Sequence, residues 1–266
     1  MTQLNNRFAR SRGTAAKYIL AFTFFISSCL NAETLSLNNS GDFTNEFSQR
    51  AGSGDNRFEE ADAIGVAGSR AIRRTSTGTE KVAYTGNTSL GSLLNQASVS
   101  IRFNYSTNST GSGGVPLFLG VSSNPNFDSS ETGTSIDDYV GVELSQRLTG
   151  SNESKLTLFN GVNGSKSQSV DSGFENLTPG WYEIELSMER VSGLLDLSIS
   201  LHRMSADGST RSEEDVITGA ISSLTNTDLL SASQSYLYVG GSDSLNRGVT
   251  ALDEIAFSGF RTPLDL

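Results

Sequence analysis

Residues 181–204 constrain the fold more than any other segment, because apolar side chains recur there at every second position in two runs. Side chains of a β-strand alternate between two faces, so each run predicts a strand with one buried face. The intervening Val-Ser-Gly at 191–193 supplies a residue that tolerates positive φ, which a tight hairpin turn requires. The segment therefore predicts a long β-hairpin. Its inward-facing residues are Tyr182, Ile184, Leu186, Met188, Leu195, Leu197, Ile199 and Leu201.

The rest of the chain after residue 32 also favours strands over helices. It is rich in Ser, Thr, Asn and Gly, which are common in turns, and no 12-residue amphipathic helical stripe is evident, although 220–230 fits one or two helical turns. Many short strands joined by loops of unequal length predict an all-β fold, a two-sheet antiparallel jelly-roll sandwich. The other predicted strands are 33–37, 63–66, 71–73, 81–84, 98–105, 115–121, 139–144, 155–159, 236–240 and 251–260.

Residues 1–32 have the layout of a secretory signal peptide, with basic residues, then an apolar run over 18–26, then small residues. Two cleavage interpretations remain open. Ile26-Ser27-Ser28-Cys29 resembles a lipobox, in which Cys29 would carry a lipid anchor, whereas Leu30-Asn31-Ala32 fits ordinary cleavage that discards Cys29. We therefore expect one domain over 33–266, secreted or held at the cell-envelope surface, with a membrane contacted only through that anchor.

Charge and cysteine content narrow the range of partners and stabilising bonds. The chain carries a formal charge of -10, and its first 32 residues contribute four positive charges, so the remainder carries -14. Such a charge balance argues against nucleic acid as a partner, because its phosphates need a basic surface.

Cys29 is the one cysteine of the sequence, so no intramolecular disulfide can form and stability must come from burial.

The order of segments resembles the concanavalin A-like lectin/glucanase superfamily, in its LamG-like region. The closing Asp253-Glu254 followed by an apolar strand is the best single marker. The resemblance implies a jelly roll of two antiparallel sheets, and it extends to lectins, carbohydrate-binding modules, glucanases and polysaccharide lyases. The segments that carry it are GDFTNEF, SVSIRFNY, PLFLGV, YVGVEL, KLTLFNG, GWYEIELSMER, LLDLSISLHRM, YLYVGG and ALDEIAFSGF.

No catalytic set is complete in the sequence. Glycoside hydrolysis needs two carboxylates, and Glu183, Glu185 and Glu189 share one strand face, but Ser187 interrupts the acid motif of the superfamily's glucanases. We expect these acids on a solvated face. The lone histidine, His202, is expected at the surface, and one histidine without a retained cysteine cannot complete a zinc site.

Calcium is the one metal for which the sequence offers ligands, because Ca²⁺ binds oxygen atoms and several acids lie in or near loops. The candidates are Asp137, Asp138, Asp243 and Asp253, although no EF-hand spacing occurs and each also fits an Asx turn or a plain loop acid.

Sugar binding would use exposed aromatic rings with polar rims. The candidate rings are Trp181, Tyr139, Tyr236 and Tyr238, with Phe127 as a further aromatic outside the expected core. The alternative is that these rings line the core.

Together these features predict a non-catalytic jelly-roll domain that binds a polysaccharide or other glycan, or mediates surface adhesion. Two alternatives remain, a polysaccharide-degrading enzyme on the same fold and a structural component of a surface or matrix.

Overall fold

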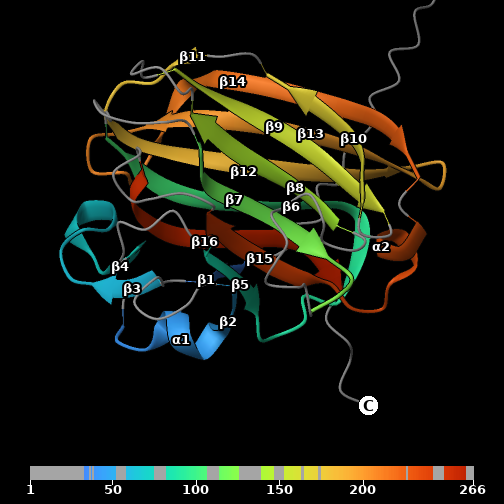
Figure 1. Ribbon diagram of the computed structural model, residues 1–266, viewed down its shortest axis with the longest axis horizontal. Helices are drawn as coiled ribbons and strands as arrows, with labels where there is room; N and C mark the ends of the chain where they lie inside the picture. The colour runs from blue at the N-terminus through green and yellow to red at the C-terminus, as the bar shows by residue number, and fades with distance from the viewer. Residues whose placement is uncertain are drawn as a thin grey trace, which may run out of the picture.

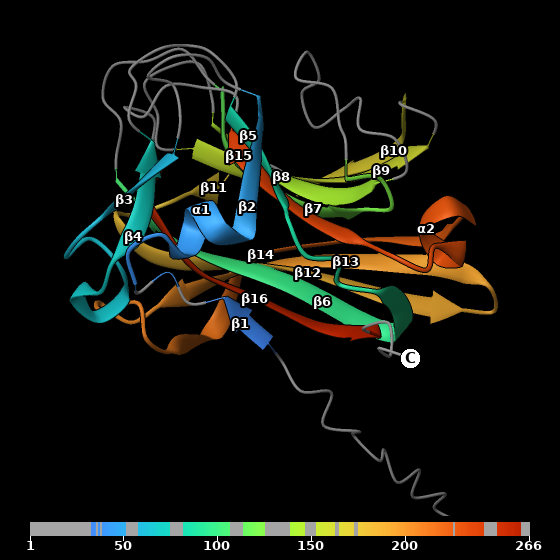
Figure 2. The ribbon, with the colours of Figure 1, turned by 90° about the horizontal axis from the view of Figure 1, so that it is seen from below.

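The computed structural model describes two stacked β-sheets with three short helical segments (Figures 1 and 2). The helical segments are α1 (Asp42–Glu46), the 3-10 turn η1 (Val66–Gly68) and α2 (Thr227–Ser231). No described helix is long and apolar enough to span a membrane. The structure describes residues 33–35, 37, 39–51, 58–74, 82–106, 114–125, 139–146, 153–162, 165–172, 175–225, 227–241 and 249–261.

Sheet A is the lower layer of Figure 2, and β1 (Glu33–Leu35) pairs with β16 outside its main path. In spatial order its strands are β14 (Arg211–Leu224), β13 (Leu194–Met204), β12 (Gly180–Val191), β6 (Ser92–Tyr105), β16 (Val249–Arg261), β4 (Ala71–Arg74) and β3 (Phe58–Ala61).

Sheet B is the upper layer of Figure 2, and β11 (Glu175–Asn176) pairs with β9 outside its main path. In spatial order its strands are β10 (Ser165–Asp171), β9 (Glu153–Val162), β8 (Tyr139–Gln146), β7 (Gly114–Ser122), β15 (Tyr236–Gly241), β5 (Val82–Gly86) and β2 (Phe47–Ala51). Every strand pair described in the two sheets is antiparallel.

The predicted hairpin is confirmed as β12 and β13, which pair in unbroken register from Tyr182 opposite Arg203 to Val191 opposite Leu194. Ser192 and Gly193 both have positive φ, which gives the two-residue turn that suits the twist of paired strands. All eight side chains predicted to face inward are at most 2 % exposed. They pack into one hydrophobic core with inward residues of sheet B such as Leu119 and Val142.

The chain closes the fold in the middle of sheet A rather than at its edge. The last strand, β16, lies between β6 on one side and β4 and β1 on the other. Its pairing with β6 shifts register between Asp253 and Ile255, so Glu254 is an extra residue in a β-bulge with positive φ.

The strand prediction fails in two ways. Residues 63–66 form a turn that leads into η1 rather than a strand, because the chain there folds over Trp181 instead of pairing. The missed strands include β14, β3, β10 and β2, which are the four end strands of the two sheet paths. An end strand pairs on one side only and needs fewer buried side chains, so its sequence alternates weakly. The expected helical turn in 220–230 is α2, whereas the segment up to Leu224 belongs to β14.

Replacing Leu186 by Ala tests the inward face of the hairpin. Leu186 is fully buried on a strand paired on both sides, so we expect the free energy of unfolding to fall by about 2–5 kcal/mol. Urea unfolding followed by circular dichroism measures this. The control Val191→Ala removes an exposed side chain near the turn and should change the free energy by less than about 0.5 kcal/mol. Equal effects of the two substitutions would contradict the assigned register.

Candidate functional site

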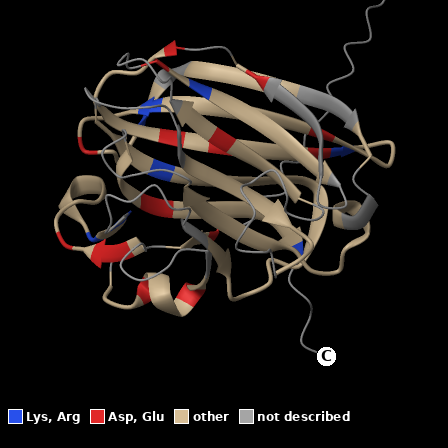
Figure 3. Cartoon of the chain, viewed as in Figure 1, with Lys and Arg blue, Asp and Glu red and all other residues tan. Residues whose placement is uncertain are grey.

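Six ionisable side chains form a cluster on the face of sheet A that points away from the core. We call it the charged cluster. Its members come from five neighbouring strands, and in Figure 3 blue and red segments alternate across neighbouring strands at one end of the sheet. The members are Arg102 of β6, Glu183 and Glu185 of β12, His202 of β13, Arg211 of β14 and Glu254 of β16.

Strand register brings the charged cluster together. Glu183 pairs with Arg102 on one side and with His202 on the other, and Arg102 pairs in turn with Asp253. Side chains directly opposite each other on adjacent strands have Cβ atoms about 5 Å apart. Strand pairing alone therefore places Arg102, Glu183 and His202 side by side, and no loop is needed to position them.

Glu183 is the centre of the cluster and is only 4 % exposed. Its Oε2 accepts a hydrogen bond from Arg102 Nε at 2.9 Å, and its Oε1 accepts one from Arg211 Nη2. The expectation of a solvated glutamate at 183 is therefore wrong. The strand that carries it is interior to the sheet, and two guanidinium groups cover its carboxylate, that of Arg102 from the adjacent β6 and that of Arg211 from β14 beyond β13.

Glu185 and His202 extend the cluster along the sheet. Arg211 Nη2 also lies 2.7 Å from Glu185 Oε2, and His202 Nε2 lies 3.7 Å from the same oxygen and 2.8 Å from the hydroxyl of Ser200. The side chain of His202 is 12 % exposed, so it is partly buried rather than fully at the surface as expected. Burial opposes the charged form of Arg211, but hydrogen bonding and attraction from Glu183 and Glu185 outweigh it and raise the pKa of Arg211.

Glu254 completes the charged cluster from the bulge in β16. Its Oε2 forms an ion pair with Arg102 Nη1. Burial raises the pKa of Glu254 above 4.5, and the neighbouring charges of Asp253 and Glu183 act in the same direction, while Arg102 opposes them. Positive φ is rare for a residue other than glycine, and both bulges and such strained residues are concentrated beside functional sites.

Asp253 has a structural role beside the cluster. Its Oδ2 accepts hydrogen bonds from the backbone N–H of Val66 at 2.8 Å and the hydroxyl of Ser69 at 2.9 Å, and its Oδ1 accepts one from the N–H of Glu254. It thereby anchors the η1 turn on sheet A. These bonds use acceptor positions that a Ca²⁺ ion would need.

A small apolar cluster borders the charged cluster on the same face. Trp181 packs there with Val66 and Met204, and Gly208 lies so close to the indole that a Cβ at 208 would be 2.8 Å from the ring. Trp181 is 5 % exposed, which leaves little of its ring for stacking on a sugar. Its predicted role in ligand binding stays a prediction.

Three other predicted aromatic residues, Tyr139, Tyr236 and Tyr238, lie on sheet B. Tyr139 and Tyr238 are in edge-to-face contact with ring centroids 6.0 Å apart, and both are buried on the face opposite Leu237. The Tyr238 ring lies over Gly120 and Gly141, where a Cβ would collide with its hydroxyl, and burial raises its pKa well above the ordinary value. Tyr236 is partly exposed and donates a hydrogen bond to Gln234.

Beyond the charged cluster, short hydroxyl side chains continue the outer face of sheet A. Strand register aligns Ser258, Ser98, Ser187 and Ser198 in one row across four strands. Glu185 lies between Ser100 and Ser200 in the neighbouring row. This surface cannot be predicted from the sequence, because its serines come from four strands and only the register shows that they are adjacent.

Several candidates fall outside the described residues, namely Cys29, Phe127, Asp137, Asp138, Asp243 and the 1–32 segment, so their predictions stay predictions. Among the described residues, no group of three or more His, Cys, Asp or Glu side chains could hold a metal ion. Calcium binding therefore rests on the sequence prediction alone.

Replacing Glu183 by Gln tests whether its carboxylate holds the cluster together. Glutamine leaves Arg102 and Arg211 with one carboxylate partner each instead of two, so we expect a loss of about 1.5–3 kcal/mol in the free energy of unfolding, the range for hydrogen bonds to charged groups. The matched substitution Glu59→Gln breaks an exposed pair with Arg73 on the same sheet and should cost less than about 1 kcal/mol. Similar losses in urea unfolding would show that Glu183 is solvated after all.

The raised pKa of Glu254 predicts a pH dependence of stability. The folded state binds this proton more tightly than the unfolded state, so stability should fall as pH rises from 4.5 through the folded-state pKa. Glu254→Gln should remove that part of the slope, measured as denaturation midpoints between about pH 4 and about pH 7. Glu189→Gln, an exposed change on the same strand face as Glu183, should keep the wild-type slope. An unchanged slope in Glu254→Gln would contradict the prediction.

Comparison with known proteins identifies the fold. No protein-family model matches the sequence, and no curated protein is significantly similar to it. Solved structures do match. A legume lectin-like domain from Entamoeba histolytica has a TM-score of 0.54 at 7% identity over 86% of this chain and 97% of its own. The CBM2 module of the evolved Dit protein of Lactobacillus casei BL23 phage J-1 has a TM-score of 0.53 at 11% identity, over 87% of this chain and 96% of its own. The lectin UEA-II complexed with galactose has a TM-score of 0.52 at 10% identity, over 86% of this chain and 98% of its own. The domain thus has the concanavalin A-like jelly-roll fold that the sequence predicted, and the matched structures share its legume lectin-like form.

Proposed function

We propose that this domain binds carbohydrate without transforming it, and that the glycan lies on the outer face of sheet A at the charged cluster. The observation that carries the proposal is the fixed array of planar charged groups beside rows of serine hydroxyls. Guanidinium and carboxylate groups hydrogen bond to sugar hydroxyls, and here Arg211, Glu185 and Glu254 keep 42%, 24% and 30% of their side chains exposed.

The array is held in place before any ligand arrives. Arg211 contacts both Glu183 and Glu185, and Arg102 contacts both Glu183 and Glu254, so each guanidinium is fixed by two carboxylates. Groups that are already ordered lose little conformational freedom on binding, which favours affinity.

The balance of charge favours a neutral glycan. The cluster holds three carboxylates against two guanidinium groups and one imidazole, and the whole chain is acidic. The charges of the cluster nearly cancel, so it does not offset the repulsion that a sulfated or uronate-rich polysaccharide meets from the acidic chain. The fold likeness agrees with sugar binding in general, since one of the matched lectins is complexed with galactose.

The experiment is a binding assay on the full chain with galactose-terminated glycans, neutral glucans and alginate, using a glycan array followed by calorimetry. Arg211→Ala should weaken binding of the neutral glycan about tenfold or more, because a hydrogen bond to a charged group contributes about 1.5–3 kcal/mol. Arg73→Ala removes an exposed, paired arginine at the end of the same sheet and should leave affinity unchanged. Preferred binding of alginate, or equal loss in both variants, would overturn the proposal.

One observation favours an enzyme as the second candidate. Glu254 has a raised pKa beside a second carboxylate, Glu183, and glycoside hydrolysis needs one protonated and one ionised carboxyl group. A reducing-sugar assay on every glycan that binds distinguishes the candidates. If a glycan is hydrolysed and Glu254→Gln abolishes this turnover, the function is hydrolysis rather than binding alone.

We also propose that the domain acts outside the cell or at its envelope, as the leader-like 1–32 segment suggests. Intact-mass measurement of the protein recovered from its native host tests this, because a diacylated Cys29 and a free N-terminus have different masses.

A further inference from the structure

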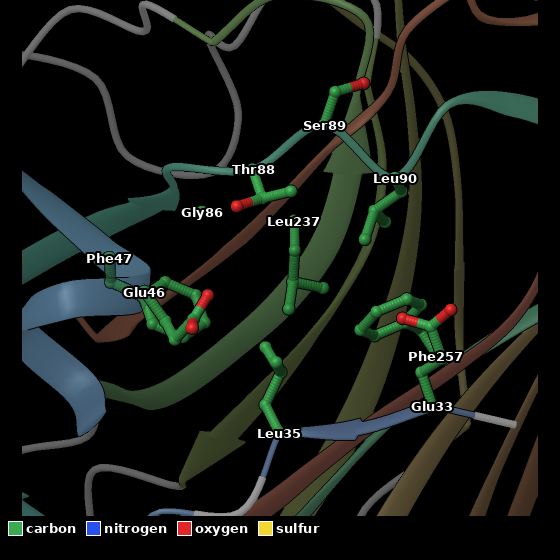
Figure 4. A pocket seen from close by; sticks show the side chains of 10 residues that line it. All are labelled: Glu33, Leu35, Glu46, Phe47, Gly86, Thr88, Ser89, Leu90, Leu237 and Phe257. Atoms are coloured by element: carbon green, nitrogen blue, oxygen red, sulfur yellow. The ribbon is translucent and has the colours of Figure 1, made fainter. Parts of the chain in front are cut away.

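A pocket of about 300 Å³ opens between the two sheets, away from the charged cluster. β1 and β16 of sheet A form one side, and the starts or ends of β2, β5 and β15 of sheet B form the other, with the 88–90 connection completing the wall (Figure 4). The pocket belongs to the gap between the layers, so it is independent of the proposed carbohydrate site.

The floor of the pocket is apolar. Figure 4 shows Leu35, Leu90 and Leu237 pointing toward its centre, flanked by Phe47 and Phe257. Leu237, Phe47 and Leu90 are buried parts of the core, whereas Leu35 and Phe257 are only partly buried and pack against that core. A small apolar ligand could therefore bind in the pocket and cover apolar side-chain surface that is now in contact with water.

The rim of the pocket is acidic. Glu33 and Glu46 lie on opposite sides, beside Phe257 and Phe47 respectively in Figure 4, and the polar remainder of the lining is Thr88 and Ser89. None of the described residues that line the pocket is Lys, Arg or His. Neither Glu33 nor Glu46 forms an ion pair with a described basic residue, unlike Glu59, Glu60 and Glu183.

We propose that this pocket binds a small organic cation, a primary amine carried on an aromatic or branched alkyl body. The body occupies the space between Leu35, Leu237 and Phe257, and the ammonium group lies at the rim. An ammonium has three donors and no acceptor, which matches a rim that offers two carboxylates and the hydroxyl group of Thr88. A volume at the lower end of those seen for ligand sites fits a molecule of roughly this size.

The probe is 2-phenylethylamine added to the full chain, with binding measured by ligand-observed NMR and calorimetry. The neutral analogue 2-phenylethanol and the anionic analogue phenylacetate keep the ring and change the charge. We expect the amine to bind most tightly, the alcohol more weakly and the acid least. Equal affinity of amine and alcohol would overturn the charge argument, and absence of saturable amine binding would overturn the site.

Three substitutions locate the amine. Glu33→Gln and Glu46→Gln should each weaken its binding about two- to fivefold, the range expected for partly exposed charge pairs. Gly86→Val should abolish binding by filling the pocket. A Cβ at 86 would meet Leu237 at 3.5 Å or more, which is ordinary contact, and valine suits a strand.

Glu175→Gln changes an exposed glutamate on β11, outside the pocket, and is the matched control. It should bind the amine as the unchanged protein does, and circular dichroism should show all four variants folded. Retention of full affinity in folded Gly86→Val would place the amine elsewhere and refute the proposal. Because the glycan assay uses a different face, failure of either experiment leaves the other intact.

Discussion

Burial of alternate side chains on the interior strands of sheet A is the constraint on which the rest of the structure depends. β12 is paired along most of its length with β13 and with β6, so each inward residue meets apolar neighbours from both sides. The single cysteine lies at position 29, and the domain has no disulfide to replace that burial. The stability of the domain therefore comes mainly from a continuous apolar layer between the sheets.

The same alternation decides what the opposite face can hold. Once Tyr182 and Ile184 point inward, Glu183 must point outward, into a row where Arg102 of the next strand lies opposite. Ion pairing then makes a carboxylate tolerable at a position with almost no solvent contact. Trp181 and the η1 turn cover one end of that row, while the serine rows leave the remainder open to ligands.

The sequence predicts interior strands well and end strands poorly, for a physical reason. The strand with the clearest alternation, β12, has partners on both sides, whereas β14 has one partner and a sequence rich in Ser and acidic residues. β10 reads SKSQSVD and carries almost no apolar signal, because it is also an end strand. Its place in the sheet follows from pairing with β9, which no local pattern encodes.

The candidate site was predictable only in part. Glu183 and Glu185 stood out by their spacing, but burial of Glu183 depends on Arg102 and Arg211, which lie 81 and 28 residues away. Trp181 stood out as the lone tryptophan, yet Gly208 and the η1 turn cover it. The inter-sheet pocket left no signal at all, because its lining comes from β1, β2, β5, β15 and β16.

The central position of β16 has a consequence for how the chain reaches its native state. Among the described strands, β1 and the β3–β4 hairpin join sheet A through β16, which follows them far along the chain. The β3–β4 hairpin can form from local pairing alone, whereas its junction with the rest of sheet A needs β16. Contacts between residues far apart in the chain form slowly, so we expect this junction to be a late step of folding.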